Sequence, residues 1–313
     1  MSTKKATRIN PVFWGLLLFI LAQVLILLIV PRIDPFLNEN NIFVPSQPPQ
    51  IIAWWPGEVT LPSGEIIDVP AQSALGPILI YILASASVLA LTLALIPFSV
   101  LRILIRLLFA FLFSWGAFIA TVFFLPLPLS IAIAFLFGIF WFITPTVWLH
   151  NLALILALTS LGAVFGRLVT PWTVMVLILL LAIYDFLAVR LGFMLWMANS
   201  LSKVAALPAI IIPKDYTEWR LNLGKQGGRS LVEENPADRE FSILGGGDIA
   251  FPCLLTASIY FAHGLGAAAS IAIFGLLGLG SAYAIQATLL KGRPIPALPP
   301  IAAATLVGLL IIT

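Results

Sequence analysis

The sequence predicts an all-α polytopic membrane protein with nine transmembrane helices. Hydrophobic residues make up 61% of the 313 residues, charged residues only 9%, and the mean hydropathy is +1.10. A soluble domain is about half apolar and about a quarter charged, so a chain of this composition belongs in a bilayer. Its apolar residues fall into runs of roughly 20 residues, the length that crosses a hydrocarbon core of about 30 Å.

Charged residues, glycines and prolines divide the chain into nine apolar spans. The first follows Lys4, Lys5 and Arg8, a flank that also precedes signal peptides. Its run is longer than the apolar core of a signal peptide and no small-residue cleavage site follows it, so we expect a retained span. An eight-span division remains open because the breaks between 99 and 167 are weak. The nine spans are predicted at residues 11–31, 74–98, 103–125, 129–147, 150–167, 171–190, 241–262, 265–289 and 296–313.

The distribution of basic residues orients these spans. With the N-terminus in the cytosol, only Arg32 and Arg167 of the 16 Lys and Arg residues fall on the outer side. Lys and Arg concentrate on the cytosolic side of membrane proteins, so we expect a cytosolic N-terminus and an outer C-terminus. The longer polar segments are then an outer loop at 32–73 and a cytosolic loop at 191–240. We divide the chain into an N-terminal transmembrane part, 1–170 (spans 1–5), and a second part, 171–313 (spans 6–9).

Each of these two loops contains a segment with extended character. LPSGEI at 61–66 is predicted to form a turn between two short extended pieces of the outer loop. ALPAIIIP at 206–213 is short, rich in β-branched residues and bracketed by prolines. We therefore expect it to be an extended segment of the cytosolic loop rather than a helix.

Two carboxylates lie at membrane depth. Of the 13 acidic residues, all but Asp185 and Asp248 fall in the two loops. An ionisable group at the centre of a span costs about 2.5–3.5 kcal/mol or more, which makes each of the two a candidate functional residue. The alternative is a structural aspartate that hydrogen-bonds a neighbouring helix. That alternative is weaker for two aspartates on adjacent spans.

The two aspartates are predicted to meet. Asp185 precedes Arg190, at the inner end of its span, by about 7.5 Å, and Asp248 follows Glu240 by about 12 Å, at 1.5 Å per residue. Because the two spans run in opposite directions, both carboxylates reach a similar level in the cytosolic half of the membrane. Carboxylates in contact share a proton, so that one serves as general base and the other as general acid. Such a pair activates a water against a peptide carbonyl, and we predict neither a metal nor a cofactor.

The residues around the pair suit this chemistry. Gly245 to Gly247 precede Asp248 and disfavour a regular helix, which leaves room for a substrate backbone and a water; close helix packing is the alternative. Tyr184 is a candidate hydrogen-bond donor beside Asp185, with aromatic packing as the alternative. PIPALPP at 294–300 predicts a rigid, non-helical start of the last span, which membranes tolerate only where protein or water surrounds it.

Other chemistries lack their motifs. His150 and His263 are expected in short loops on opposite faces, so no shared metal site is predicted. The glycine run is followed by Asp rather than by the GK[ST] of a phosphate-binding loop, and a GxSG-type nucleophile elbow is absent from the sequence. The single cysteine, Cys253, excludes an intrachain disulfide.

Three motifs occur in a characteristic order. YD at 184–185, GGGD at 245–248, which fits the pattern GxGD, and PALP at 296–299 resemble the presenilin and signal peptide peptidase family of intramembrane aspartyl proteases. The resemblance implies a presenilin-like fold with Asp185 and Asp248 as the catalytic pair. It implies that the site is shaped by Tyr184, Gly245, Gly247, Pro296, Ala297 and Leu298. It further implies that a substrate path is lined by Pro208, Ala209, Ile210, Ile211 and Ile212, which pair with an extended substrate segment.

The resemblance predicts an intramembrane aspartyl endopeptidase. Its substrates would be single-pass transmembrane proteins or peptides, cut by an Asp-activated water, with no nucleic-acid partner. The 191–240 loop is shorter than that of animal presenilins, so we expect a prokaryotic, archaeal homologue of the cell membrane that acts without accessory subunits. Two alternatives remain: a proton or cation transporter or channel that uses the paired carboxylates, and a family member that binds transmembrane helices without cutting them.

Overall fold

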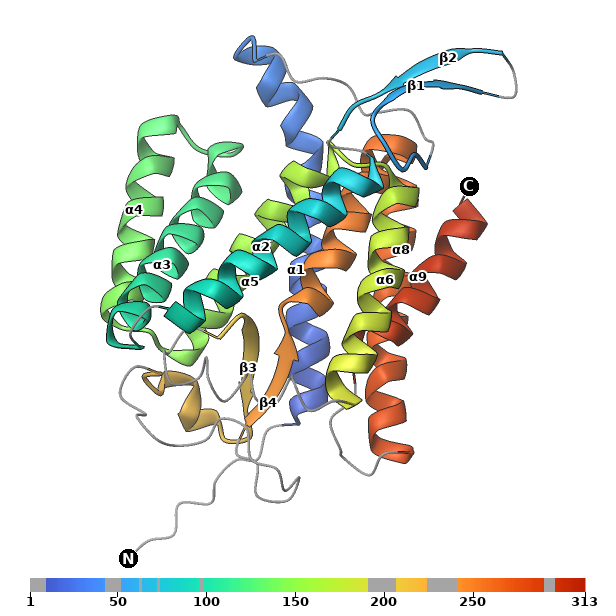
Figure 1. Cartoon of the computed structure of the whole chain (residues 1–313). Coiled ribbons are helices and arrows are strands. Elements are labelled where there is room, and N and C mark those ends of the chain that lie inside the picture. The colour runs from blue at the N-terminus through green and yellow to red at the C-terminus, as the bar shows by residue number, and fades with distance from the viewer. Residues whose placement is uncertain are drawn as a thin grey trace, which may run out of the picture.

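The computed structural model describes residues 10–42, 52–61, 64–71, 74–95, 98–190, 207–223, 241–289 and 296–312. Most of this part of the chain is helical, and two small two-stranded sheets accompany the helices. In Figure 1, α3 and α4 stand at one side of the molecule and α6, α8 and α9 at the other, with α1, α2 and α5 between them.

The helices are predominantly apolar, as the composition predicts. They are α1 (Pro11–Glu39), α2 (Leu75–Leu95), α3 (Phe98–Val122), α4 (Leu127–Ile143), α5 (Val147–Gly166), α6 (Pro171–Arg190), α8 (Gly247–Thr288) and α9 (Leu298–Ile312). Among the described residues, five helices are long and apolar enough to cross a membrane, namely α1, α3, α5, α6 and α8. Shorter apolar helices lie in α2, α4 and α9.

The first helix continues beyond its predicted end at residue 31. Two prolines, Pro31 and Pro35, lie inside α1, which ends only at Glu39. A proline inside a helix removes one backbone hydrogen bond, but here the packed face continues through the buried Ile33. Near this end of α1, Asp34 forms an ion pair with Arg167 at the end of α5, with 2.8 Å between Oδ1 and Nε. The polar outer segment therefore begins after Glu39 rather than at residue 32.

The two extended pieces predicted on either side of 61–66 are confirmed. Strand β1 (Gly57–Thr60) pairs with strand β2 (Ile66–Val69) in an antiparallel hairpin. Figure 1 shows this hairpin projecting from the end of the molecule near the C-terminus. Its base is buried where Val69 packs with Ala53 and Ala74, and α2 begins directly after this contact.

The helix α8 contains two of the predicted spans, joined at one residue. Gly264 has φ 81° and ψ −176°, which is not helical, and the predicted break between the spans lies at this position. A Cβ on Gly275 would lie 3.8 Å from the Cβ of Pro252. Because these residues stand at similar distances on either side of Gly264, the two parts of α8 run antiparallel and pack side by side, as their paths in Figure 1 also indicate.

Replacing Gly264 by alanine is expected to destabilise this helical hairpin. Backbone with φ near +80° and ψ near 180° is accessible almost only to glycine, and another residue there costs about 1–3 kcal/mol. Gly266→Ala is the matched control, because a Cβ on Gly266 meets nothing within 4 Å and alanine favours helix. Thermal unfolding in detergent should show a lower Tm for Gly264→Ala only. Equal Tm values for the two variants would contradict this reading of the turn.

Two hydrophobic clusters hold the helices together, and α8 takes part in both. The first joins α1, α3, α5 and α8 through fully buried residues such as Phe19, Phe113 and Ile155. The second joins α6, α8 and α9 and includes the fully buried Met175 and Ile178 of α6. Because lipid tails are as apolar as these side chains, close van der Waals packing rather than removal from water stabilises the clusters. The position of α8 is therefore determined from both sides.

The second sheet corrects one predicted span and confirms one predicted segment. Strand β3 (Ala209–Pro213) pairs antiparallel with strand β4 (Phe241–Gly245), from Ala209 opposite Gly245 to Pro213 opposite Phe241. The segment 206–213 is thus extended, as predicted. The span predicted at 241–262 begins as a strand, because residues 241–245 pair with β3 and the helix starts only at Gly247. A short 3₁₀ helix, η1 (Tyr216–Arg220), follows β3; the remainder of the 191–240 loop, 191–206 and 224–240, lies outside the described residues.

His150 lies in a helix rather than in a loop, whereas His263 adjoins the predicted break at Gly264. His150 is fully buried in α5, and His263 is exposed in α8 just before Gly264. The prediction for His150 was wrong because α4 already ends at Ile143, four residues before the end predicted for that span. Thr144 and Pro145 are non-helical, since a residue before proline disfavours helix, and α5 begins at Val147.

Candidate active site

Asp185 is held by the start of the last helix. It lies in α6, five residues before Arg190, and is half-buried. The backbone N–H of Leu298 donates a hydrogen bond to its carboxylate. Leu298 is the first residue of α9, and the first N–H groups of a helix have no partner within that helix. The start of α9 therefore supplies a fixed donor to Asp185.

Asp248 is held by the end of β4. It is the second residue of α8, and only 8% of it is exposed. Its carboxylate accepts a hydrogen bond from the backbone N–H of Gly245. A Cβ on Gly245 would lie 3.0 Å from Oδ2 of Asp248, closer than such contacts normally come. The glycine thus allows the carboxylate to fold back onto the strand that precedes it.

The two carboxylates lie near each other in the structure. Asp185 lies within electrostatic range of Asp248. The reason is tertiary: α6, α8 and α9 all pack against one another, which brings Asp185, Asp248 and Leu298 to one place. No group of three or more His, Cys, Asp or Glu side chains suited to a metal ion is found in the described ranges. The chemistry available from the two carboxylates is the transfer of protons to and from a bound water.

Gly246 was not among the predicted site residues, although its environment is the tightest of the three glycines. Its backbone N–H donates to the carbonyl oxygen of Pro208 at 2.9 Å. A Cβ at this position would lie 2.7 Å from that oxygen, whereas one on Gly247 would meet Phe251 at an ordinary 3.6 Å. The middle position of GxGD is therefore restricted by contact with the segment before β3. The GxGD pattern leaves this position open, so its only signal in the sequence was the run of three glycines.

A second residue near the pair was also not predicted. The Tyr283 hydroxyl lies within electrostatic range of Asp248, and it reaches the site from the second part of α8. An isolated tyrosine in an apolar span gives no pattern from which this could be inferred. Tyr184, which was predicted, is 56% exposed. Although it adjoins Asp185 in the chain, its ring lies at the protein surface.

The PAL segment forms the entry to α9. Pro296 and Ala297 are half-buried and non-helical, and Leu298, 4% exposed, begins the helix. The non-helical start predicted over 294–300 is confirmed, within the described residues, only for Pro296 and Ala297; for 298–300 it was wrong, because α9 already includes Pro299 and Pro300. Proline is tolerated in the first turn, where the N–H groups have no partner within the helix. This short non-helical stretch is what places the Leu298 N–H beside Asp185.

The predicted substrate segment is buried and engaged along both edges. Residues 209–213 are buried, and Pro208 is exposed. One edge of β3 pairs with β4. On the other edge, the Asn151 side chain donates to the Ile211 carbonyl at 2.7 Å and accepts from the Ile211 N–H at 2.9 Å. His150 Nε2 lies 2.9 Å from the Leu207 oxygen and 3.3 Å from the Ala209 oxygen.

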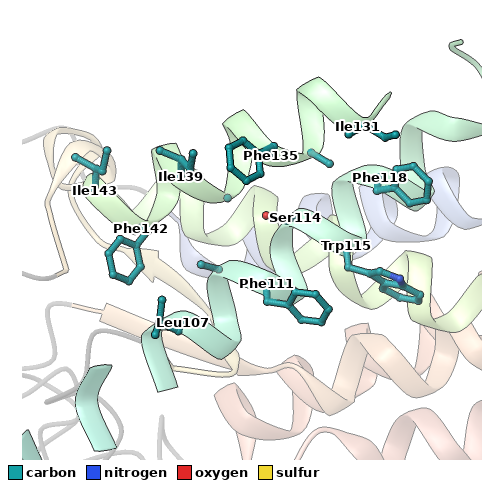
Figure 2. A pocket seen from close by; sticks show the side chains of 13 residues that line it. Leu107, Phe111, Ser114, Trp115, Phe118, Ile131, Phe135, Ile139, Phe142 and Ile143 are labelled. Carbon is teal, nitrogen blue, oxygen red and sulfur yellow. The ribbon is translucent and has the colours of Figure 1, made fainter. Parts of the chain in front are cut away.

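One cavity in the described structure lies away from the aspartates. It is an open, apolar groove of about 660 Å³ between α3 and α4, shown in Figure 2. Phe111 and Trp115 of α3 line it on one side, and Phe135 and Ile139 of α4 on the other. Both helices pack against α5, on the side of the molecule opposite α6 and α9 in Figure 1. The groove therefore belongs to the apolar surface and not to the candidate active site.

Comparisons with known proteins give a family and a similar fold. The family model described as "Signal-peptide peptidase, presenilin aspartyl protease" matches residues 66–313. The fold is similar to a presenilin family intramembrane aspartate protease solved in space group C222, with a TM-score of 0.58, 18% identity, and coverage of 97% of this chain and 98% of that one. A structure of such a protease in space group P2 matches with a TM-score of 0.53, 16% identity, and coverage of 95% and 94%. The search of curated proteins found no match.

Proposed function

The chain belongs to the signal-peptide peptidase and presenilin family of aspartyl proteases, and from that premise we propose that it cuts transmembrane helices with a water activated by Asp185 and Asp248. As a member of this family it is a multi-pass integral membrane protein of the intramembrane aspartyl protease class. Our proposal concerns three further points: which residues are catalytic, that a water attacks the peptide bond, and which substrates are cut.

One observation carries the proposal. Asp185 and Asp248 interact with each other, and each accepts a hydrogen bond from a backbone N–H, of Leu298 and of Gly245 respectively. Backbone donors do not titrate, so they orient both carboxylates while leaving the shared proton free to move. One ionised carboxylate removes a proton from water, and the protonated partner donates to the substrate carbonyl oxygen. The same pair then returns a proton to the leaving amine.

An extended substrate segment is proposed to join the outer edge of β4. Among the described residues, β4 is an edge strand of its sheet, and it leads directly into Asp248. Because Ile211 turns both backbone groups towards Asn151, its partner Ile243 turns its own away from β3. These outward groups are free to pair with an added strand. Residues 208–212, which were predicted to line the substrate path, would then act indirectly. They would support β4, and β4 would bind the substrate.

Replacing Ile243 by proline tests this edge. Its N–H points away from β3, so proline removes only the outward donor and is tolerated on an edge strand. We expect an unchanged Tm but a rise in KM, or a fall in kcat/KM, of about five- to tenfold for one lost hydrogen bond. Ile243→Val is the matched control and should behave like the parent. Parent-like kinetics of Ile243→Pro would place the substrate elsewhere.

The same proposal includes nine spans with a cytosolic N-terminus. In the described ranges, α1 to α6, the two parts of α8, and α9 provide nine apolar helical segments. The ion pair between Asp34 and Arg167 supports the span count, because an even number of spans between the two residues places both on the same side of the membrane. Cysteine accessibility from either side of sealed vesicles, probed near Asp34 and near Tyr216, distinguishes this topology from its inverse. In this proposal, residues 1–170 contain spans 1–5 and residues 171–313 contain spans 6–9 with both aspartates.

The proposed function is tested with the purified chain alone. The protein is reconstituted in liposomes with a single-pass transmembrane peptide, and the products are analysed by mass spectrometry. We expect two fragments cut within the membrane segment, with no accessory subunit added. An intact peptide after prolonged incubation would reject autonomous cleavage. Ion flux through the same liposomes that depends on Asp185 would instead indicate a carboxylate relay.

A further inference from the structure

We propose that Asn151, together with His150, is a positioning residue that takes the place of a third strand beside β3 and so determines which peptide bond reaches the two aspartates. The inference rests on the proposed proteolysis and on the substrate strand along β4. It adds a determinant of cleavage position that lies in α5, outside the YD, GGGD and PALP motifs.

Asn151 forms with Ile211 of β3 the two backbone hydrogen bonds that a neighbouring strand would form. Its carboxamide donates to the Ile211 carbonyl and accepts from the Ile211 N–H, at 2.7 and 2.9 Å. A carboxamide carries the same donor and acceptor as a peptide group, so both backbone groups of one residue are satisfied at once. Both Asn151, 1% exposed, and Ile211, 0% exposed, are buried. Water therefore cannot replace these hydrogen bonds, and a buried backbone group left without a partner is costly.

His150 contacts the same edge of β3 at the residues that precede Ile211. Its Nε2 lies within reach of the carbonyl oxygens of Leu207 and Ala209. Two carbonyls can only accept, so Nε2 carries the proton and donates to both. Residues two apart on a strand turn their backbone groups to the same side, which is why Ala209 and Ile211 both face α5. Consecutive residues of α5 thus cap this edge of β3.

These contacts determine the register of the sheet relative to the catalytic pair. They prevent β3 from sliding along α5, and β4 follows β3 through its pairing, Ile210 opposite Leu244 and Ile212 opposite Ser242. The Gly246 N–H, bonded to the Pro208 carbonyl, continues this pairing up to the start of α8. A slip of one residue would turn every side chain of a strand to the other face. A substrate strand on β4 therefore inherits a register that Asn151 determines.

The cap also determines how firmly β3 is held. Without the Asn151 carboxamide, the buried Ile211 backbone groups would lose their partners, and β3 would no longer be held to α5 at this residue. The sheet, and a substrate strand paired with β4, could then adopt a shifted register. The consequence is a change of cleavage position rather than a loss of the chemistry, because Asp185 and Asp248 keep their own hydrogen bonds to Leu298 and Gly245.

The experiment compares the products of Asn151→Ala and the parent. Both are reconstituted in liposomes with the same single-pass peptide, and the fragment masses are determined. We expect cleavage at neighbouring bonds to rise about tenfold relative to the parent bond, the change expected for losing the two hydrogen bonds to Ile211. His150→Gln, which keeps an N–H donor, should retain the parent products to a greater extent than His150→Leu.

Ser160→Ala is the matched control. Ser160 is buried in the same helix and donates to the Gly116 carbonyl of α3 at 2.8 Å, so this variant loses a buried hydrogen bond without touching β3. We expect it to lower the Tm and to leave the fragment masses unchanged. If Asn151→Ala fails to fold, Asn151→Leu, of similar volume, takes its place in the comparison.

The outcomes separate the two proposals. Parent fragment masses from a folded Asn151 variant, or a folded variant that cuts nothing, would overturn the positioning role while the parent still shows Asp185-dependent cleavage. A parent protein that cuts no peptide would overturn the proposed function, and the positioning role with it. Shifted fragments in the Asn151 variant and not in the Ser160 variant are the supporting result.

Discussion

Replacing either Asp185 or Asp248 by asparagine is expected to abolish cleavage of a transmembrane peptide. Asparagine has nearly the same shape and still accepts the hydrogen bonds from Leu298 and Gly245, but it cannot take up or release the proton. A general acid or base contributes about 10²–10⁴-fold to a rate. The two aspartates act on one water and one shared proton, so each single variant should lose about as much activity as the double variant.

The measurement is the initial rate of fragment formation in liposomes, with Tm recorded for each variant. Asp215→Asn is the matched control. Asp215 caps η1 by accepting from the Thr217 N–H, a role that asparagine fills equally well, and it should keep the parent rate. A single Asp185 or Asp248 variant that cuts the peptide at the parent rate would remove the catalytic assignment.

Replacing Gly278 by alanine is expected to have the next largest effect. A Cβ on Gly278 would lie 2.5 Å from the Cα of Ile301 and 3.0 Å from the Pro300 carbonyl oxygen. Both neighbours are backbone atoms of the first turn of α9, so they cannot move aside without shifting that helix. Overpacking of this kind costs about 1–3 kcal/mol. The shift also moves the nearby Leu298, whose N–H orients Asp185.

Gly278→Ala should therefore lower both the Tm and kcat, and the fall in kcat should persist well below the Tm. Gly280→Ala is the matched control, two residues further along the same helix, because its Cβ would meet nothing within 4 Å. Alanine there favours the helix, so neither Tm nor kcat should fall. A Gly278→Ala protein with normal kcat would show that Asp185 does not depend on the position of α9.

The candidate pair could be predicted because its signals are local and strong. Asp185 and Asp248 are the two acidic residues in long apolar runs, and their depths follow from the rise per residue and the nearest charged residues. The orientation follows from the basic residues, and the family from three short motifs. Asp34 and Arg167, assigned to one side from charge alone, form an ion pair in the structure. These features can be recognised in the sequence whichever way the helices pack.

The ends of the spans were predicted less well, because pairing and packing outweigh local preference. Residues 241–245 form a strand because β3 lies beside them; by hydropathy alone they continue a membrane helix. The helix α1 passes Pro31 because the packed face continues through Ile33. His150 is buried in α5 and bonded to carbonyls some sixty residues away in the chain. Each of these outcomes depends on residues that are distant in sequence.

By itself, the sequence determined that this chain is a helical membrane protein of the presenilin and signal-peptide peptidase family, with two carboxylates at one level. Only the tertiary structure decided what holds those carboxylates: the Leu298 N–H of α9 for Asp185, and the Gly245 N–H at the end of β4 for Asp248. It also decided that Asn151 of α5 supports β3. Composition and motifs depend on which residues are present, whereas a hydrogen bond depends on where two distant segments meet.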